Sequence, residues 1–233
     1  MESAKQLQVH IVLIHGACHG AWSWYKLKPL LEAADHRVTA LDLSASGIDS
    51  RSLYELRTFA DYTQPLIELM AAFRRRKRLG PAMDDGFCGE RLVAEIKGCL
   101  YWERTPAEEW LDTEFLTYGT PEQPLTSMFF GPNFVASKLY QLYLFEDVAL
   151  AKMLLRPSSL FREDLSRKSA FSKERFGSVK RVYIVCTEDR AIPVNFQRWQ
   201  IETIGVAEVK ELRMLIIWLC SQSPYKFFNV YSR

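Results

Sequence analysis

Short apolar runs alternate with amphipathic stretches over the first 70 residues of the chain. Residues 9–14 are β-branched and nearly continuously apolar, which is typical of a strand buried on both faces of a parallel sheet, and residues 37–41 predict a second strand. Residues 24–34 and 56–70 place apolar side chains at helical spacing. Strand, turn, helix, strand, loop and helix, in this order, predict a doubly wound α/β sheet.

This alternation stops after residue 73. Residues 73–98 combine a run of basic side chains with Gly, Pro and Asp, and they offer no apolar run where a doubly wound sheet places its central strand. Residues 101–167 are rich in aromatic side chains and are divided by prolines. We therefore expect mostly helical or irregular structure over 101–167.

Strand-like runs return in the last quarter of the chain. Residues 181–186 form another buried-type apolar run, and residues 206–212 predict a final strand. Between them, residues 193–204 predict a helix with proline in its first turn. A chain of 233 residues fits one α/β domain better than two, so we expect a single domain over 1–233.

Composition narrows the class of protein without naming a function. Hydrophobic side chains make up 48% and charged side chains 25% of the chain, which is ordinary for a globular protein. No apolar run approaches the ~20 residues of a membrane helix, and the polar start does not resemble a secretory signal. Five scattered cysteines fit a reducing compartment better than a disulfide framework. We expect a cytoplasmic protein with no membrane partner.

The positive charge is concentrated in two segments. Residues 71–100 hold seven basic and four acidic side chains, residues 213–233 hold three basic and no acidic ones, and the whole chain carries only +2. The basic run from Arg74 to Arg78 could bind nucleic acid, but neither interleaved aromatic residues nor a nucleic-acid fold accompanies it. We interpret the run as a solvated charge cluster and expect no nucleic-acid partner.

Seven stretches spread along the chain carry recognisable motifs, beginning with His15-Gly-Ala-Cys-His-Gly-Ala-Trp22. The stretches are 15–22, 25–34, 39–47, 103–110, 124–132, 156–161 and 175–189. They resemble the plant methylesterase and hydroxynitrile lyase group of α/β-hydrolases. The resemblance implies an α/β-hydrolase fold, with about 101–170 as a cap-like insertion and with 71–100 and 213–233 as atypical segments.

The same resemblance implies a chemistry. Members hydrolyse methyl esters of small carboxylic acids with a Ser-Asp-His triad, without a metal or organic cofactor. Methyl salicylate, methyl jasmonate and methyl indole-acetate are the substrates it suggests, so the expected ligand is a small ester or carboxylate. It also allows a homodimer.

Several site residues carry over position by position from this resemblance. Asp189 matches the triad acid, and the backbone N–H of Ala17 matches an oxyanion-hole donor. Five residues match an apolar acyl pocket: Tyr101, Trp110, Phe115, Met128 and Leu160.

Two triad members have no counterpart in this sequence. No Gly-x-Ser-x-Gly occurs, and all four histidines lie within the first 36 residues. We interpret His15 and His19 as hydrogen-bonding residues of a loop, and Cys88 as a chance likeness to an elbow because no strand precedes it. We therefore expect the chain as written to be inactive, since loss of triad function removes a factor of roughly 10⁶.

The tail suggests how the histidine was lost. Residues 213–224 can be encoded so that reading from the third nucleotide yields Asp-Ala-Asp-His-Met-Ala-Met-Leu-Ser-Glu-Pro. We hypothesise a frame-shifted copy of an esterase C-terminus. In the hydroxynitrile lyase branch a lysine follows that histidine, so the shifted frame favours an esterase. A non-catalytic hormone-binding protein is the remaining alternative.

Overall fold

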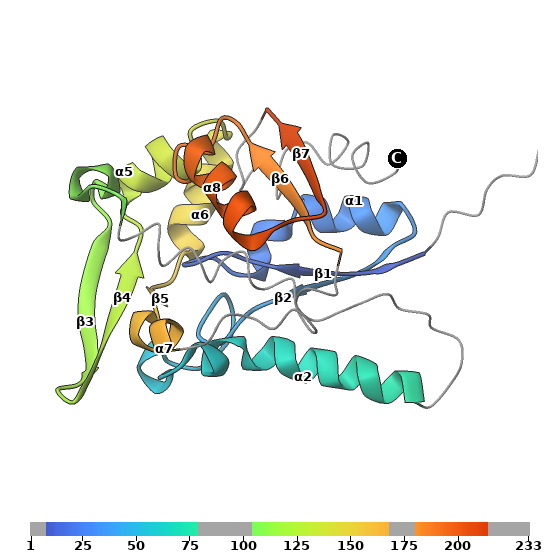
Figure 1. Cartoon of the computed structure of the whole chain (residues 1–233), viewed down its shortest axis with the longest axis horizontal. Helices are drawn as coiled ribbons and strands as arrows, with labels where there is room; N and C mark the ends of the chain where they lie inside the picture. The colour runs from blue at the N-terminus through green and yellow to red at the C-terminus, as the bar shows by residue number, and fades with distance from the viewer. Residues whose placement is uncertain (1–7, 79–103, 168–179, 214–233) are drawn as a thin grey trace, which may run out of the picture.

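The described residues contain two parallel strand pairs, each joined by a helical crossover, and one antiparallel sheet (Figure 1). The computed structural model describes residues 8–78, 104–167 and 180–213. β1 (His10–Ile14) pairs in parallel with β2 (Arg37–Leu41), with His10 opposite Arg37. β6 (Val182–Cys186) pairs in parallel with β7 (Glu208–Leu212).

Helices connect the strands of each pair, as parallel strands require. η1 (Ala21–Trp24) and α1 (Leu27–Ala33) lie between β1 and β2, and α8 (Val194–Ile204) lies between β6 and β7. The helix predicted over 24–34 corresponds to α1, which begins three residues later and ends one residue earlier, and η1 precedes it. The predicted βα units and the α/β class are confirmed.

The β1–β2 pair packs against other elements on both faces, as the apolar run predicts, although Leu13 is its one buried residue. Leu13 packs with Leu27 and Leu31 of α1 in one cluster. Val12, on the other face of β1, packs in a second cluster that contains Leu66 of α2. In Figure 1, α1 and α2 accordingly lie on opposite sides of this strand pair.

α2 (Phe59–Arg78) follows the short η2 (Leu53–Glu55) and is eight residues longer at its C-terminal end than the helix expected to end at residue 70. Pro65 lies near the start of α2, and no glycine or proline follows it within the helix. Arginine and lysine are good helix formers, so the basic run extends the helix.

The expectation of helical or irregular structure over 101–167 is wrong for its middle part. β3 (Glu114–Thr120) and β4 (Gln123–Phe129) form an antiparallel hairpin, and β5 (Ser158–Ser159) pairs with β4. Pro121 lies in the hairpin turn, and Pro124 lies beyond the two β4 residues that pair with β5. Pro124 faces Gly119 within the β3–β4 ladder but lies outside the pairing of β4 with β5, so its missing N–H costs no hydrogen bond to β5.

Short helices surround this antiparallel sheet. They are η3 (Ala107–Trp110), α5 (Pro132–Phe134), the π-helical η4 (Val135–Leu139), α6 (Phe145–Leu154) and α7 (Arg162–Arg167). Among the described residues, no helix combines the length and apolar character that crossing a membrane requires. The predicted loss of the central strand falls almost entirely outside the described residues, as does the tail beyond Arg213.

Candidate active site

The loop after β1 is held by two buried histidines. The side chain of His15 is 1% exposed; its Nδ1–H donates to the Gly16 carbonyl at 2.9 Å, and its Nε2 accepts from the Leu43 N–H at 3.0 Å. The Nδ1–H of His19 donates to the Ala17 carbonyl at 2.8 Å, and Nε2 accepts from the Tyr140 hydroxyl at 2.9 Å.

Burial keeps both imidazoles neutral. Loss of solvation lowers the pKa of His15, and it lowers the pKa of His19 to about 4. Each ring already uses both nitrogens, and within the described residues neither ring is hydrogen-bonded to a serine or cysteine side chain. These two histidines therefore order the loop, as expected, and neither is placed to act as a base.

Ala17 and Cys18 lie between these histidines in a tight turn. Cys18 has φ +63°, and its Sγ donates to the Met128 carbonyl at 3.3 Å, while its own carbonyl accepts from the Arg156 N–H at 3.0 Å. The N–H of Ala17 donates to no acceptor within the part of the chain that the structure describes. Such an N–H, in a loop fixed on both sides, is able to donate to a ligand oxygen.

A second anchored loop follows β6. The side chain of Gln197 is completely buried; its Oε1 accepts from the Cys186 N–H at 2.9 Å, and its Nε2 donates to the Cys186 and Ile192 carbonyls. Asp189 lies in this loop, where its Oδ1 accepts from the N–H groups of Ala191 and Ile192 at 2.8 and 2.6 Å. The carboxylate is thus fixed just beyond the carboxyl end of a parallel strand, where α/β sheets place their sites.

One apolar cluster brings the predicted acyl-pocket residues together with both loops. Trp110 and Met128 belong to its buried core, and Phe115 and Leu160 pack against it. Cys18 and Ala191, which neighbour Ala17 and Asp189 in the sequence, belong to the same core. Tyr101 lies outside the described residues. We call the cluster that contains Trp110, Met128, Cys18 and Ala191, together with Phe115 and Leu160 packed against it, the Trp110 cluster.

Aromatic side chains of the Trp110 cluster pack against one another and form one side of the expected acyl pocket, which we call the wall. Trp110 and Phe115 meet edge to face, with ring centroids 5.6 Å apart at 87°. Phe115 lies directly opposite Met128 in the β3–β4 hairpin, so both side chains project from the same face of it. Edge-to-face aromatic pairs resist deformation, so this wall holds its shape.

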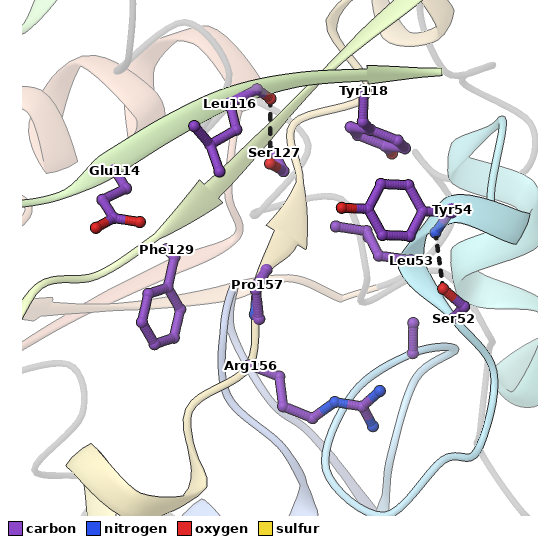
Figure 2. Close-up of a pocket in the computed structure, with 11 residues that line it drawn as sticks. Ser52, Leu53, Tyr54, Glu114, Leu116, Tyr118, Ser127, Phe129, Arg156 and Pro157 are labelled. Carbon is purple, nitrogen blue, oxygen red and sulfur yellow. Dashed lines mark hydrogen bonds between the residues drawn. The ribbon is translucent and has the colours of Figure 1, made fainter. Parts of the chain in front are cut away.

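A separate cavity of about 270 Å³ contains none of the predicted site residues (Figure 2). It lies between the β3–β4 hairpin, the η2 region and the segment that leads from α6 to β5. Sequence reasoning missed this cavity and also missed Tyr140, Arg156 and Gln197. Their roles depend on contacts between distant segments, which no local motif signals.

Among the described residues, no group of three or more histidine, cysteine or acidic side chains is arranged to hold a metal ion. What the described residues do provide is an apolar wall, a backbone donor in a rigid loop, and a fixed carboxylate. An apolar wall with a few fixed polar groups is the combination that sites for small, mostly apolar ligands use.

A family model described as alpha/beta hydrolase fold matches residues 9–82. The crystal structure of polyneuridine aldehyde esterase superposes with a TM-score of 0.83 at 41% identity, covering 97% of this chain and 100% of that one. The fold and the positions of the two loops therefore define an α/β-hydrolase.

Curated relatives narrow the class. Salicylic acid-binding protein 2 of Nicotiana tabacum is 57% identical, with 88% of each chain covered. Methylesterase 1 of Arabidopsis thaliana is 41% identical over 90% of this chain and 89% of that relative. The chain belongs to the plant methylesterase family of ester hydrolases, which confirms the resemblance inferred from its motifs.

Proposed function

We propose that this chain binds methyl esters of small carboxylic acids against the Trp110 cluster and does not hydrolyse them. The substrate class is that of methyl salicylate, methyl jasmonate and methyl indole-acetate. One observation carries the proposal: the acyl wall is present, while the sequence holds neither a Gly-x-Ser-x-Gly nor a histidine beyond residue 36. The name of the tobacco relative, a salicylic acid-binding protein, supports a salicylate-like acyl group.

In this proposal each retained group has a role of its own. The Ala17 N–H donates to the ester carbonyl oxygen, and the apolar wall contacts the acyl group. Asp189 occupies the position of the triad acid, whose task in a complete site is to orient the histidine and stabilise its charged form. Without a serine and a histidine, the carbonyl carbon meets no activated nucleophile, so binding ends without a covalent step.

Hydroxynitrile lyase activity requires the same serine and histidine, so it fails for the same reason. The shifted reading frame of the tail, which gives methionine after the histidine, supports an esterase ancestor. A single domain with a cap-like insertion, a cytoplasmic location and a homodimer stay predictions.

The test compares binding and hydrolysis on the purified full chain. Isothermal titration with methyl salicylate measures binding, and chromatography of the same samples measures released salicylate. Phe115→Ala removes a ring from the wall, whereas Thr117→Ala, an exposed position on the same strand, serves as the matched control.

We expect the wild-type chain and Thr117→Ala to bind equally, and Phe115→Ala to bind at least about tenfold more weakly, because a lost aromatic contact costs about 1.5–3 kcal/mol. Salicylate release should match the buffer rate in all three samples. Release above that rate would refute the loss of activity, and equal binding by Phe115→Ala would refute the assignment of the wall.

A further inference from the structure

The cavity beside the hairpin is built from parts of the chain that lie far apart in sequence. Tyr54 comes from η2, Leu116 and Tyr118 from β3, Phe129 from β4, and Arg156 from the segment after α6. Figure 2 shows these side chains around a common space, with Glu114 at the rim. All of them lie within the described residues.

The hairpin lies between this cavity and most of the Trp110 cluster, although Phe129 both lines the cavity and packs against the cluster. Successive strand residues project to opposite faces, so Phe115 and its partner Met128 point one way while Leu116 and its partner Ser127 point the other. Phe115 and Met128 belong to the Trp110 cluster, and Leu116 and Ser127 line the cavity. A ligand in the cavity is therefore on the other side of the sheet from an ester at the wall.

Arg156 gives the cavity a cationic donor. Its Nη1 donates to the Gly47 and Asp49 carbonyls at 3.0 and 2.7 Å, and its Nη2 donates to the Arg51 carbonyl at 3.3 Å. These bonds fix the guanidinium but supply only neutral acceptors, and no carboxylate within the described segments pairs with it. A guanidinium has five N–H donors, and these bonds use three of them. A carboxylate is the acceptor that matches such a group best.

Aromatic and aliphatic side chains form the walls. Tyr54 and Tyr118 meet edge to face at 5.7 Å and 84°. Tyr54 is 69% and Leu116 is 62% exposed, so a ligand would cover apolar surface that water now contacts. A cavity of roughly 150 Å³ accommodates benzene, and about 270 Å³ is available here. The space and walls therefore fit a molecule of one aromatic ring with substituents.

Glu114 limits the charge of the ligand. Glu114 is exposed, and in Figure 2 its carboxylate lies near Phe129 and away from Arg156. A second negative charge at that end would be repelled, whereas a hydroxyl group could donate to Glu114. The ligand thus carries one carboxylate at one end and a neutral or donor group at the other.

We propose that this cavity is a second binding site, for a small aromatic monocarboxylate. The site requires no catalytic residue, so it goes beyond the proposed ester binding and stands independently of it. The cavity is also linked to the proposed ester site, because the backbone N–H of Arg156 donates to the carbonyl of Cys18 in the loop that carries Ala17.

Calorimetric titration of the full chain with sodium salicylate tests the proposal. Leu116→Trp fills the cavity from an exposed position, Glu122→Trp adds the same ring at the hairpin turn as a control, and Phe115→Ala weakens the other site. Salicyl alcohol replaces the carboxylate by a neutral group. Thermal melting establishes that each variant is folded.

We expect two salicylate sites in the wild-type chain and in Glu122→Trp, and one in Leu116→Trp. Salicyl alcohol should bind the cavity at least about tenfold more weakly, because the interaction with Arg156 loses its charge. A single site abolished by Phe115→Ala and untouched by Leu116→Trp would overturn the second site and leave the proposed function intact. A single site abolished by Leu116→Trp alone would support the second site and count against the ester site. No binding by a folded sample would overturn both.

Discussion

The buried imidazole of His19 makes the stability of the fold depend on pH. Its side chain is 4% exposed and its pKa falls to about 4 on burial, against an ordinary value of 6.5. Between these two values the unfolded chain binds a proton at this position and the folded chain does not. The free energy of unfolding is therefore not reduced by His19 above the pKa of the unfolded chain, and it falls as the pH decreases toward the pKa of the folded chain.

The magnitude follows from the size of the shift. Each pKa unit corresponds to about 1.4 kcal/mol, so His19 accounts for about 3 kcal/mol across this window. Domains are typically stable by only about 5–15 kcal/mol, so the effect is measurable. The pKa of Asp49 is lowered to about 2, mainly by Arg51, so this carboxylate changes the stability of the fold at lower pH than His19 does.

His19→Gln removes the titrating group while leaving an acceptor within reach of the Tyr140 hydroxyl. Urea unfolding at several values between about pH 4 and pH 7 gives the free energy of unfolding of the variant and the wild-type chain. His15 is present in both chains, so its own burial cancels in the difference and only its electrostatic coupling to His19 is removed by the substitution. Thr117→Ala serves as the non-titrating control.

We expect the advantage of the wild-type chain over His19→Gln to shrink by about 3 kcal/mol as the pH falls from 6.5 to 4. The difference between the wild-type chain and Thr117→Ala should stay constant. A difference for His19→Gln that does not change with pH would refute the claim that this imidazole is held neutral.

Three further predictions concern other buried groups. Burial raises the pKa of the Cys18 and Cys186 thiols to about 12, so peptide mapping after iodoacetamide treatment should find both unlabelled in the native chain and labelled in urea. Gln197→Leu should lower the free energy of unfolding by about 3 kcal/mol, because it leaves buried backbone groups without partners; an unchanged urea midpoint would contradict this. Lys26, just before α1, and Asp147 of α6, which is 4% exposed, form an ion pair at 2.7 Å. A double-mutant cycle with Lys26→Met and Asp147→Asn should give a coupling free energy of about 2 kcal/mol. A coupling near zero would show that the pair does not stabilise the fold.

The βα units were predictable because their signals are local. The apolar run that ends at Ile14 sets the strand, and its alternate side chains pack against helices on both faces. The β3–β4 hairpin is not predicted by its sequence because prolines usually divide regular structure, whereas here Pro121 lies in the turn and Pro124 lies outside the pairing of β4 with β5. The basic run after residue 73 has no apolar spacing, so the pattern of apolar residues does not predict that α2 continues to Arg78.

The candidate site likewise contains residues that local sequence motifs indicate and residues that depend on contacts between distant segments. Resemblance supplied Trp110, Phe115, Met128 and Leu160, and the structure brings all four into one cluster. The bond between His19 and Tyr140 joins residues 121 positions apart, so no local pattern could reveal it. The second cavity depends on which face of the hairpin each side chain occupies, and that requires the register. The roles of Ala17 and Asp189 stay predictions.

A single proton NMR experiment tests the central claim, that this chain binds a methyl ester without hydrolysing it. Saturation transfer from protein to methyl salicylate reports binding, and the methanol signal in the same tube reports hydrolysis. We expect saturation of the ester's ring protons, with methanol accumulating no faster than in buffer. Methanol release above that rate, or absence of saturation transfer to the ester, would contradict it.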